Sequence, residues 1–111
     1  MSSEAITRND LTAILNEALP PNNRLIMERV TVASGLSISA NSVLATTQSA
    51  TVSKSGYSPI GLVGTAANNN SVIIMRAEIN SSGTIYMRLS NPTSSAISSV
   101  TVYAYVLWQP N

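Results

Sequence analysis

From Arg24 to the end of the chain, apolar and polar residues alternate with a period of two, the spacing of a half-buried β-strand. Short clusters of Gly, Asn, Ser and Pro interrupt the alternation, as expected for turns. No helical spacing appears between these interruptions. The pattern favours a mainly β chain, an antiparallel β-sandwich with jelly-roll-like connections. The predicted strands are 24–33, 35–40, 43–54, 58–63, 71–79, 84–90 and 97–108.

The first 21 residues follow a different pattern, which predicts a leader and one helix ahead of a β-domain over residues 22–111. Thr7 suits the N-cap, with Asp10 three positions later, and Pro20-Pro21 ends the helix. An apolar stripe at helical spacing is formed by Leu11, Ile14, Leu15, Ala18 and Leu19.

A helix of roughly three turns is too short to be stable in isolation, so the stripe must pack on something. One alternative is the chain's own β-domain. The other is the same helix of sister chains, or a socket on a larger assembly. We therefore assign the helix to oligomerisation or anchoring.

One hairpin can be placed in register from the sequence. Directly opposed residues lie on the same side of a sheet, and pairing Ile79 with Ile85 satisfies this condition for both strands. The pairing leaves a three-residue loop, 81–83, with Gly83 at the position where a left-handed residue closes the turn. It predicts a core face with Ile73, Met75, Ala77, Ile79, Ile85, Met87 and Leu89.

The opposite face of this hairpin carries the most notable polar cluster, Arg76, Glu78, Tyr86 and Arg88. The register places Glu78 opposite Tyr86, and Arg76 opposite Arg88. One interpretation is a charge-balanced sheet face exposed to solvent or to another subunit. The other is a ligand patch, in which Tyr stacks on a sugar and Arg with Glu binds hydroxyls or acidic groups.

The last predicted strand is apolar on both sides. Val100, Val102, Ala104, Val106 and Trp108 share one side, and Tyr103, Tyr105 and Leu107 lie on the other. A strand of this kind is covered on both faces. The face that does not meet the core is expected to be covered by a loop, by the N-terminal helix or by a neighbouring subunit, and we favour the subunit.

Side chains that perform chemistry are scarce. The chain has no His and no Cys, and only 10% of its residues are charged, against about 25% in a typical domain. A Ser nucleophile would need Lys54 as its base, and neighbouring Ser53 and Ser55 suit a turn better. We expect no enzyme activity, catalytic residue, metal ligand or cofactor.

The polar surface is expected to be uncharged, since the chain has 18 Ser, 10 Thr and 11 Asn. A net charge of +1 without a basic run argues against nucleic-acid binding, and no apolar stretch approaches the ~20 residues of a membrane span. The start, Met1-Ser2-Ser3-Glu4, lacks the pattern of a secretory signal. An exposed β-surface without an export signal suggests a virion protein made in the host cytoplasm; a cytoplasmic protein bound to a partner is the alternative.

Three stretches resemble small structural proteins of bacteriophage and prophage tail modules: ITRNDLTAILNEALPP, SKSGYSPIGLVG and VTVYAYVLW. The resemblance implies a virion component, often trimeric, in which a short helix joins a β-sandwich head. We accordingly expect a homo-oligomer in contact with other virion proteins, in a tail fibre or receptor-binding tip. Its exposed loops would touch a host cell-surface glycan or cap the particle. A capsid decoration protein or head fibre is the alternative within this class, and a monomeric carbohydrate-binding module is the alternative outside it.

Overall fold

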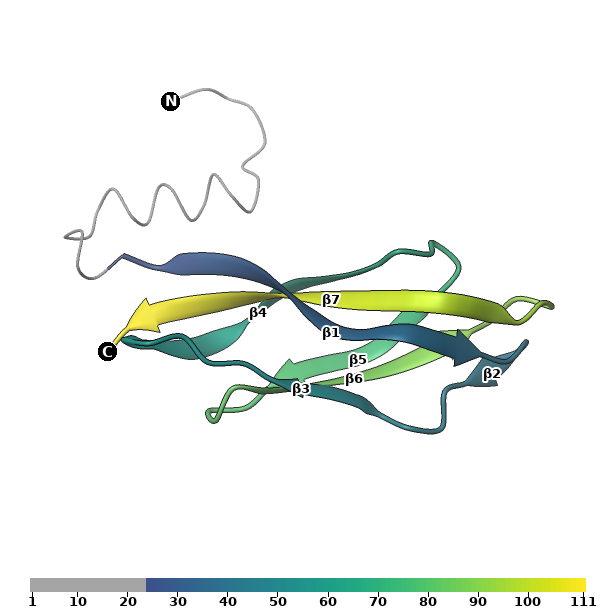
Figure 1. Cartoon of the computed structure of the whole chain (residues 1–111), viewed down its shortest axis with the longest axis horizontal. Coiled ribbons are helices and arrows are strands. Elements are labelled where there is room, and N and C mark those ends of the chain that lie inside the picture. The colour runs from purple at the N-terminus through teal and green to yellow at the C-terminus, as the bar shows by residue number, and fades with distance from the viewer. Residues whose placement is uncertain (1–23) are drawn as a thin grey trace, which may run out of the picture.

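The computed structural model describes residues 24–111, which form seven β-strands in two antiparallel sheets. Sheet A has the order β1-β7-β4. Sheet B has β6 at its centre, with β5 on one side and the short strands β2 and β3 on the other. The two sheets lie one above the other in Figure 1. The strands are β1 (Ile26–Ile38), β2 (Ser42–Val43), β3 (Gln48–Thr51), β4 (Tyr57–Ala67), β5 (Ile73–Ile79), β6 (Thr84–Asn91) and β7 (Ile97–Pro110).

The predicted mainly β, antiparallel architecture is confirmed, but the strand boundaries differ in several places. β1 continues through Ser34 and Gly35, where we expected one strand to end at 33 and the next to begin at 35. Gly35 adopts φ +67° where the register with β7 shifts, so the chain bends without leaving the sheet. β4 extends to Ala67, four residues beyond its predicted end at 63.

The predicted single strand 43–54 is in fact divided into β2 and β3. Both pair with β6, but the chain advances five positions from Val43 to Gln48, whereas their partners Ser90 and Met87 are three positions apart. The two extra residues are accommodated in a bend, which ends one strand and begins the next.

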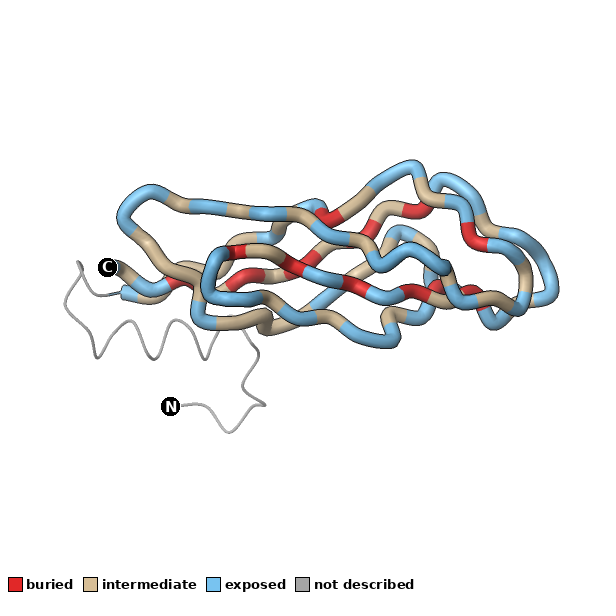
Figure 2. Tube along the Cα trace, turned by 90° about the horizontal axis from the view of Figure 1, so that it is seen from below, coloured by how far each residue is buried: buried red, intermediate tan, exposed pale blue. Residues whose placement is uncertain are grey.

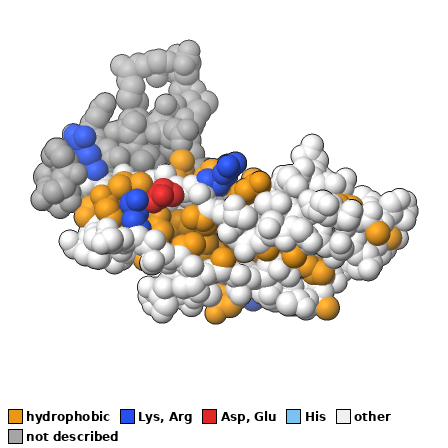
Figure 3. All heavy atoms as spheres, viewed as in Figure 1, with side chains coloured by type: hydrophobic (Ala, Val, Ile, Leu, Met, Phe, Trp, Pro, Cys, Tyr) orange, Lys and Arg blue, Asp and Glu red, His pale blue; other side chains and the backbone are white. Residues whose placement is uncertain are grey.

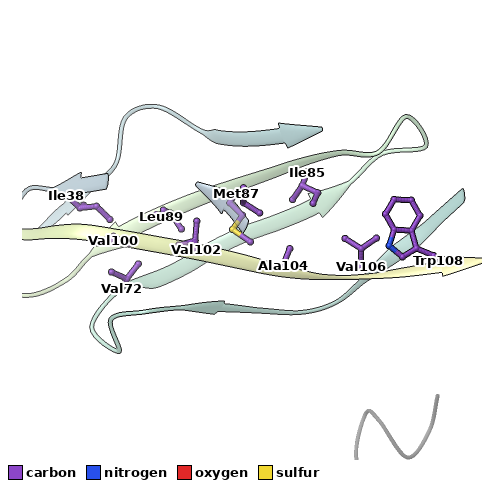
Figure 4. Close-up of a cluster of buried hydrophobic side chains, with 11 residues drawn as sticks. Ile38, Val72, Ile85, Met87, Leu89, Val100, Val102, Ala104, Val106 and Trp108 are labelled. Atoms are coloured by element: carbon purple, nitrogen blue, oxygen red, sulfur yellow. The ribbon is translucent and has the colours of Figure 1, made fainter. Parts of the chain in front are cut away.

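The core lies between the sheets and is formed mainly by alternate residues of the two central strands (Figures 2 and 4). Such alternation is expected because successive side chains of a strand point to opposite faces. β6 supplies Ile85, Met87 and Leu89, and β7 supplies Val100, Val102, Ala104, Val106 and Trp108; Val32, Ile38 and Val72 complete the buried set.

One polar side chain, Asn91, is completely buried at the end of β6. Its amide Nδ2 donates to the carbonyl oxygens of Ile38 (3.1 Å) and Ser95 (2.8 Å), and its Oδ1 accepts from the Thr93 backbone N–H (2.9 Å). These bonds tie the end of β1 to the 92–96 loop and satisfy groups whose burial would otherwise cost free energy.

Candidate functional site

The predicted polar cluster is brought together by the β5–β6 hairpin, whose register is confirmed. Ile79 pairs with Ile85, and Glu78 with Tyr86. In the loop, Asn80 Oδ1 accepts from the backbone N–H groups of Ser82 and Thr84, both at 3.0 Å. Gly83 has φ +86°, the left-handed conformation that the sequence predicts.

The hairpin departs from prediction at Met75, because β5 carries a bulge between Ile74 and Arg76. Ile74 therefore faces Leu89 and packs on the core, and the prediction that Ile73 and Met75 share the core face is wrong. Their side chains are 49% and 53% exposed. Because the bulge absorbs one residue, the pairing of Arg76 with Arg88 is preserved.

Large apolar side chains gather on the outer face of sheet B, the surface formed by the outward residues of β2, β3, β6 and β5. The described residues include five exposed large hydrophobic side chains, and four of them lie here; the fifth is Ile60 of β4. Val43 and Ile73 flank Ser90 from opposite sides, and Met75 and Tyr86 lie farther along the face. Solvent-exposed apolar groups on one face are typical of a contact surface.

The charges of this face are unequally paired. Arg76 Nη2 lies 3.1 Å from Glu78 Oε2, in an ion pair on β5. Arg88 directly opposes Arg76 across the strands, yet it has no ion-pair partner among the residues that the structure describes. Directly opposed like charges are destabilising, so this arrangement favours an anionic group above the two guanidinium groups.

A hollow of about 200 Å³ lies at this position, lined by Thr47, Arg76, Glu78, Tyr86, Met87 and Arg88. All four residues of the predicted patch line it. Thr47, just before β3, contributes a further hydroxyl, which was not part of the predicted patch. A long-range pairing between β3 and β6 brings Thr47 here, and no local pattern indicates such a pairing.

The outer face of sheet A has a different character. Register places Met27 opposite Leu107 and Thr31 opposite Tyr103, and these β7 side chains, with Tyr105, are half-buried. Arg29 lies with its guanidinium carbon 4.6 Å from the centre of the Tyr103 ring. The second apolar side of β7 is thus present as expected; its cover by another subunit stays a prediction.

Other residues considered from sequence lie elsewhere. Lys54 pairs with Glu28 at 2.8 Å and its ammonium lies 5.5 Å from the centre of the half-buried Tyr57 ring. Trp108 is in the core, only 2% exposed. The predicted helix and its stripe, Leu11, Ile14, Leu15, Ala18 and Leu19, lie outside the described residues.

In Figure 3, the visible charged side chains of the described residues lie in the left half and centre of the view, and none is visible toward the right end.

Over residues 24–111, no three His, Cys, Asp or Glu side chains are grouped so as to hold a metal ion. The same residues contain no helix long and apolar enough to cross a membrane.

Comparison with known proteins gives no match, whether to a family model, a curated protein or a solved structure. The candidate site therefore rests on its own geometry. It is an exposed sheet face with four large apolar side chains, two opposed arginines and a small hollow beside them.

Proposed function

We propose that this chain is a non-enzymatic structural protein of a bacteriophage-type particle, a homo-oligomeric tail fibre or receptor-binding tip. The observation that carries the proposal is the outer face of sheet B, where Tyr86, Met75 and two arginines are exposed together. Tyr, Met and Arg are enriched where proteins bind partners. The face would be directed toward the host surface, with a cell-surface glycan as ligand.

We propose more specifically that residues 22–111 form a jelly-roll-like β-sandwich head. The support for this proposal is the nested order of the strands: β1 pairs with β7, and β2 and β3 pair with β6, the strand before β7. β4 and β5 then complete the two sheets on the other sides of β7 and β6. Jelly rolls occur in viral capsid and lectin domains, although a fold by itself does not establish function.

A homotrimer is proposed from the second apolar side of β7. Tyr103, Tyr105 and Leu107 form a half-buried row on the outer face of sheet A, which is a suitable surface for sister subunits. The N-terminal helix would bundle with its copies or dock on another virion protein. Several copies would provide avidity that one weak site lacks.

The mass of the chain in solution tests this proposal. Light scattering should give a multiple of the 11.7 kDa chain mass, three for a trimer. Leu15→Asp should reduce the oligomer to monomers because it places a charge in the helix stripe. Asn16→Asp adds the same charge outside the stripe and should leave the oligomer intact.

A clean wild-type monomer would reject the oligomeric proposal and favour a monomeric carbohydrate-binding module. The hollow beside Tyr86 and Arg88 is the observation that supports that second candidate. Hydrolytic activity of the purified chain would contradict the non-enzymatic assignment. The neighbouring genes test whether the protein belongs to the tail or to the capsid of a phage particle. A tape-measure or holin gene beside this one is expected for a tail component, and a head-assembly cluster is expected for a capsid decoration protein.

A further inference from the structure

We infer that the hollow lined by Thr47, Tyr86 and Arg88 binds a saccharide that bears a carboxylate, such as a uronic acid residue. The inference rests on the proposed function and deepens it by naming the class of ligand. It is carried by the charge, the composition and the size of the hollow, and by the bulge beside it.

The charge of the hollow indicates an anionic ligand. Arg76 and Arg88 oppose each other on neighbouring strands, and Glu78 neutralises only Arg76, at 3.1 Å. Arg88 lies diagonal to Glu78 and has no ion-pair partner among the described residues. The planar guanidinium of Arg88 matches a carboxylate, which it can bind through two parallel hydrogen bonds.

The balance of charge favours a carboxylate over a phosphate. Two arginines and one glutamate leave a net charge of +1 at the hollow. A carboxylate carries one negative charge, whereas a phosphate monoester carries about −1.5 to −2 at neutral pH. The additional negative charge of a phosphate would meet the nearby Glu78 carboxylate, so the monoanion fits better.

The remaining side chains suit a sugar ring. Tyr86 is 40% exposed, and its ring offers a flat apolar surface for the C–H face of a pyranose. Thr47 supplies a hydroxyl that can donate or accept, and the Glu78 carboxylate accepts hydrogen bonds from sugar hydroxyls. The volume of about 200 Å³ lies below the ~300–1,000 Å³ of drug-sized pockets, so the hollow suits a single sugar residue.

The bulge in β5 provides an independent structural argument. An unbulged strand would place Met75 opposite Leu89 in the core, whereas the observed strand directs Met75 outward next to Arg76. Bulges are frequent beside binding sites, where they redirect a side chain. The bulge thereby leaves the Met75 side chain exposed beside Arg76 of the hollow, although Met75 does not itself line the hollow.

Titration of the full-length chain with trigalacturonate, followed by calorimetry and by backbone amide chemical shifts, tests the inference. The matched probe is the methyl ester of the same trisaccharide, which removes only the charge. Tri-glutamate and inorganic phosphate provide the same kind of charge without a sugar ring. The variants are Arg88→Gln, Tyr86→Ala and Tyr86→Phe, with Lys54→Gln as the control for loss of one positive charge outside the hollow.

The expected result is that trigalacturonate binds wild type and shifts the amide signals of Thr47, Tyr86 and Arg88. Arg88→Gln and esterification should each weaken binding about tenfold or more, since a charge-assisted pair is lost. Tyr86→Ala should also weaken binding, whereas Tyr86→Phe and Lys54→Gln should stay within about twofold of wild type.

Three outcomes would overturn the inference: equal losses in Lys54→Gln and Arg88→Gln, tighter binding of tri-glutamate or phosphate than of trigalacturonate, or no binding to an intact oligomer. The first indicates diffuse electrostatics, and the second indicates an acidic peptide or a phosphate ligand. The third leaves the proposed structural role standing, because that role is tested by mass and by Leu15→Asp.

Discussion

Gly83 is the position where a single added methyl group should be most costly, and Gly56 provides the matched control. Both residues have positive φ, +86° and +79°, so alanine is strained at either one. A Cβ on Gly83 would lie 2.2 Å from the backbone carbonyl oxygen of Val52, whereas a Cβ on Gly56 meets nothing within 4 Å. Both variants therefore incur the cost of placing alanine in a left-handed conformation, but only Gly83→Ala adds a steric clash with Val52.

The magnitudes follow from these contacts. The left-handed conformation costs alanine about 1–2 kcal/mol at either site. At Gly83 the Val52 carbonyl cannot rotate away as a side chain would, so the backbone must move, which adds the ~1–3 kcal/mol typical of overpacking. The same movement strains the hydrogen bond from Val52 N–H to the Gly83 carbonyl oxygen (2.9 Å), with a net value of about 1 kcal/mol.

Gly83→Ala should thus lower the free energy of unfolding by about 3–6 kcal/mol, and Gly56→Ala by about 1–2 kcal/mol. The reduced entropy of the unfolded chain offsets part of the loss equally in both variants, so it cancels in the comparison. Urea denaturation followed by circular dichroism, at one fixed chain concentration, measures the difference. Equal losses in the two variants would refute the steric argument and the placement of the 81–83 loop against Val52.

Three further predictions concern the core and its edge. Met75→Ala should change the unfolding free energy by less than about 0.5 kcal/mol, whereas Ile74→Ala should cost about 2 kcal/mol, because the bulge exposes Met75 and turns Ile74 toward the core. A larger loss for Met75→Ala than for Ile74→Ala in urea denaturation would reject the bulge. Asn91→Ala should cost about 2–4 kcal/mol in the same assay, since it leaves several buried polar groups without partners, and a loss below about 1 kcal/mol would contradict that network. Trp108 Nε1 is buried without a hydrogen-bond partner among the described residues, so Trp108→Phe should cost much less than the ~3–5 kcal/mol of Trp108→Ala, and equal melting temperatures of the two variants would disprove this.

Part of the candidate site could be predicted because its members are close in sequence. A hairpin with a three-residue loop has few registers, and burial of Ile79 and Ile85 selects one of them. That register places Glu78 opposite Tyr86, so the patch follows from local information. The like-charge pair of Arg76 and Arg88 follows in the same way.

The rest of the site depends on pairings between distant segments. Thr47 reaches the hollow only because β3 pairs with the edge of β6 opposite β5, and Val43 joins the same face through β2. Nothing in the local pattern of 43–54 distinguishes one strand from two, since its division reflects the spacing of its partners on β6. Alternation also predicts the wrong face for Met75, because a bulge is selected by the fit of Ile74 against the core.

The alternation of period two and the turn residues were sufficient to predict a mainly β chain, the hairpin register and the left-handed Gly83. These features depend on steric preferences and on contacts within a few residues. The tertiary structure alone decided which strands share a sheet, where β1 and β5 bulge, and which exposed side chains meet on the outer face of sheet B. Those outcomes depend on how two sheets fill one common core, a long-range condition that no single segment of the chain contains.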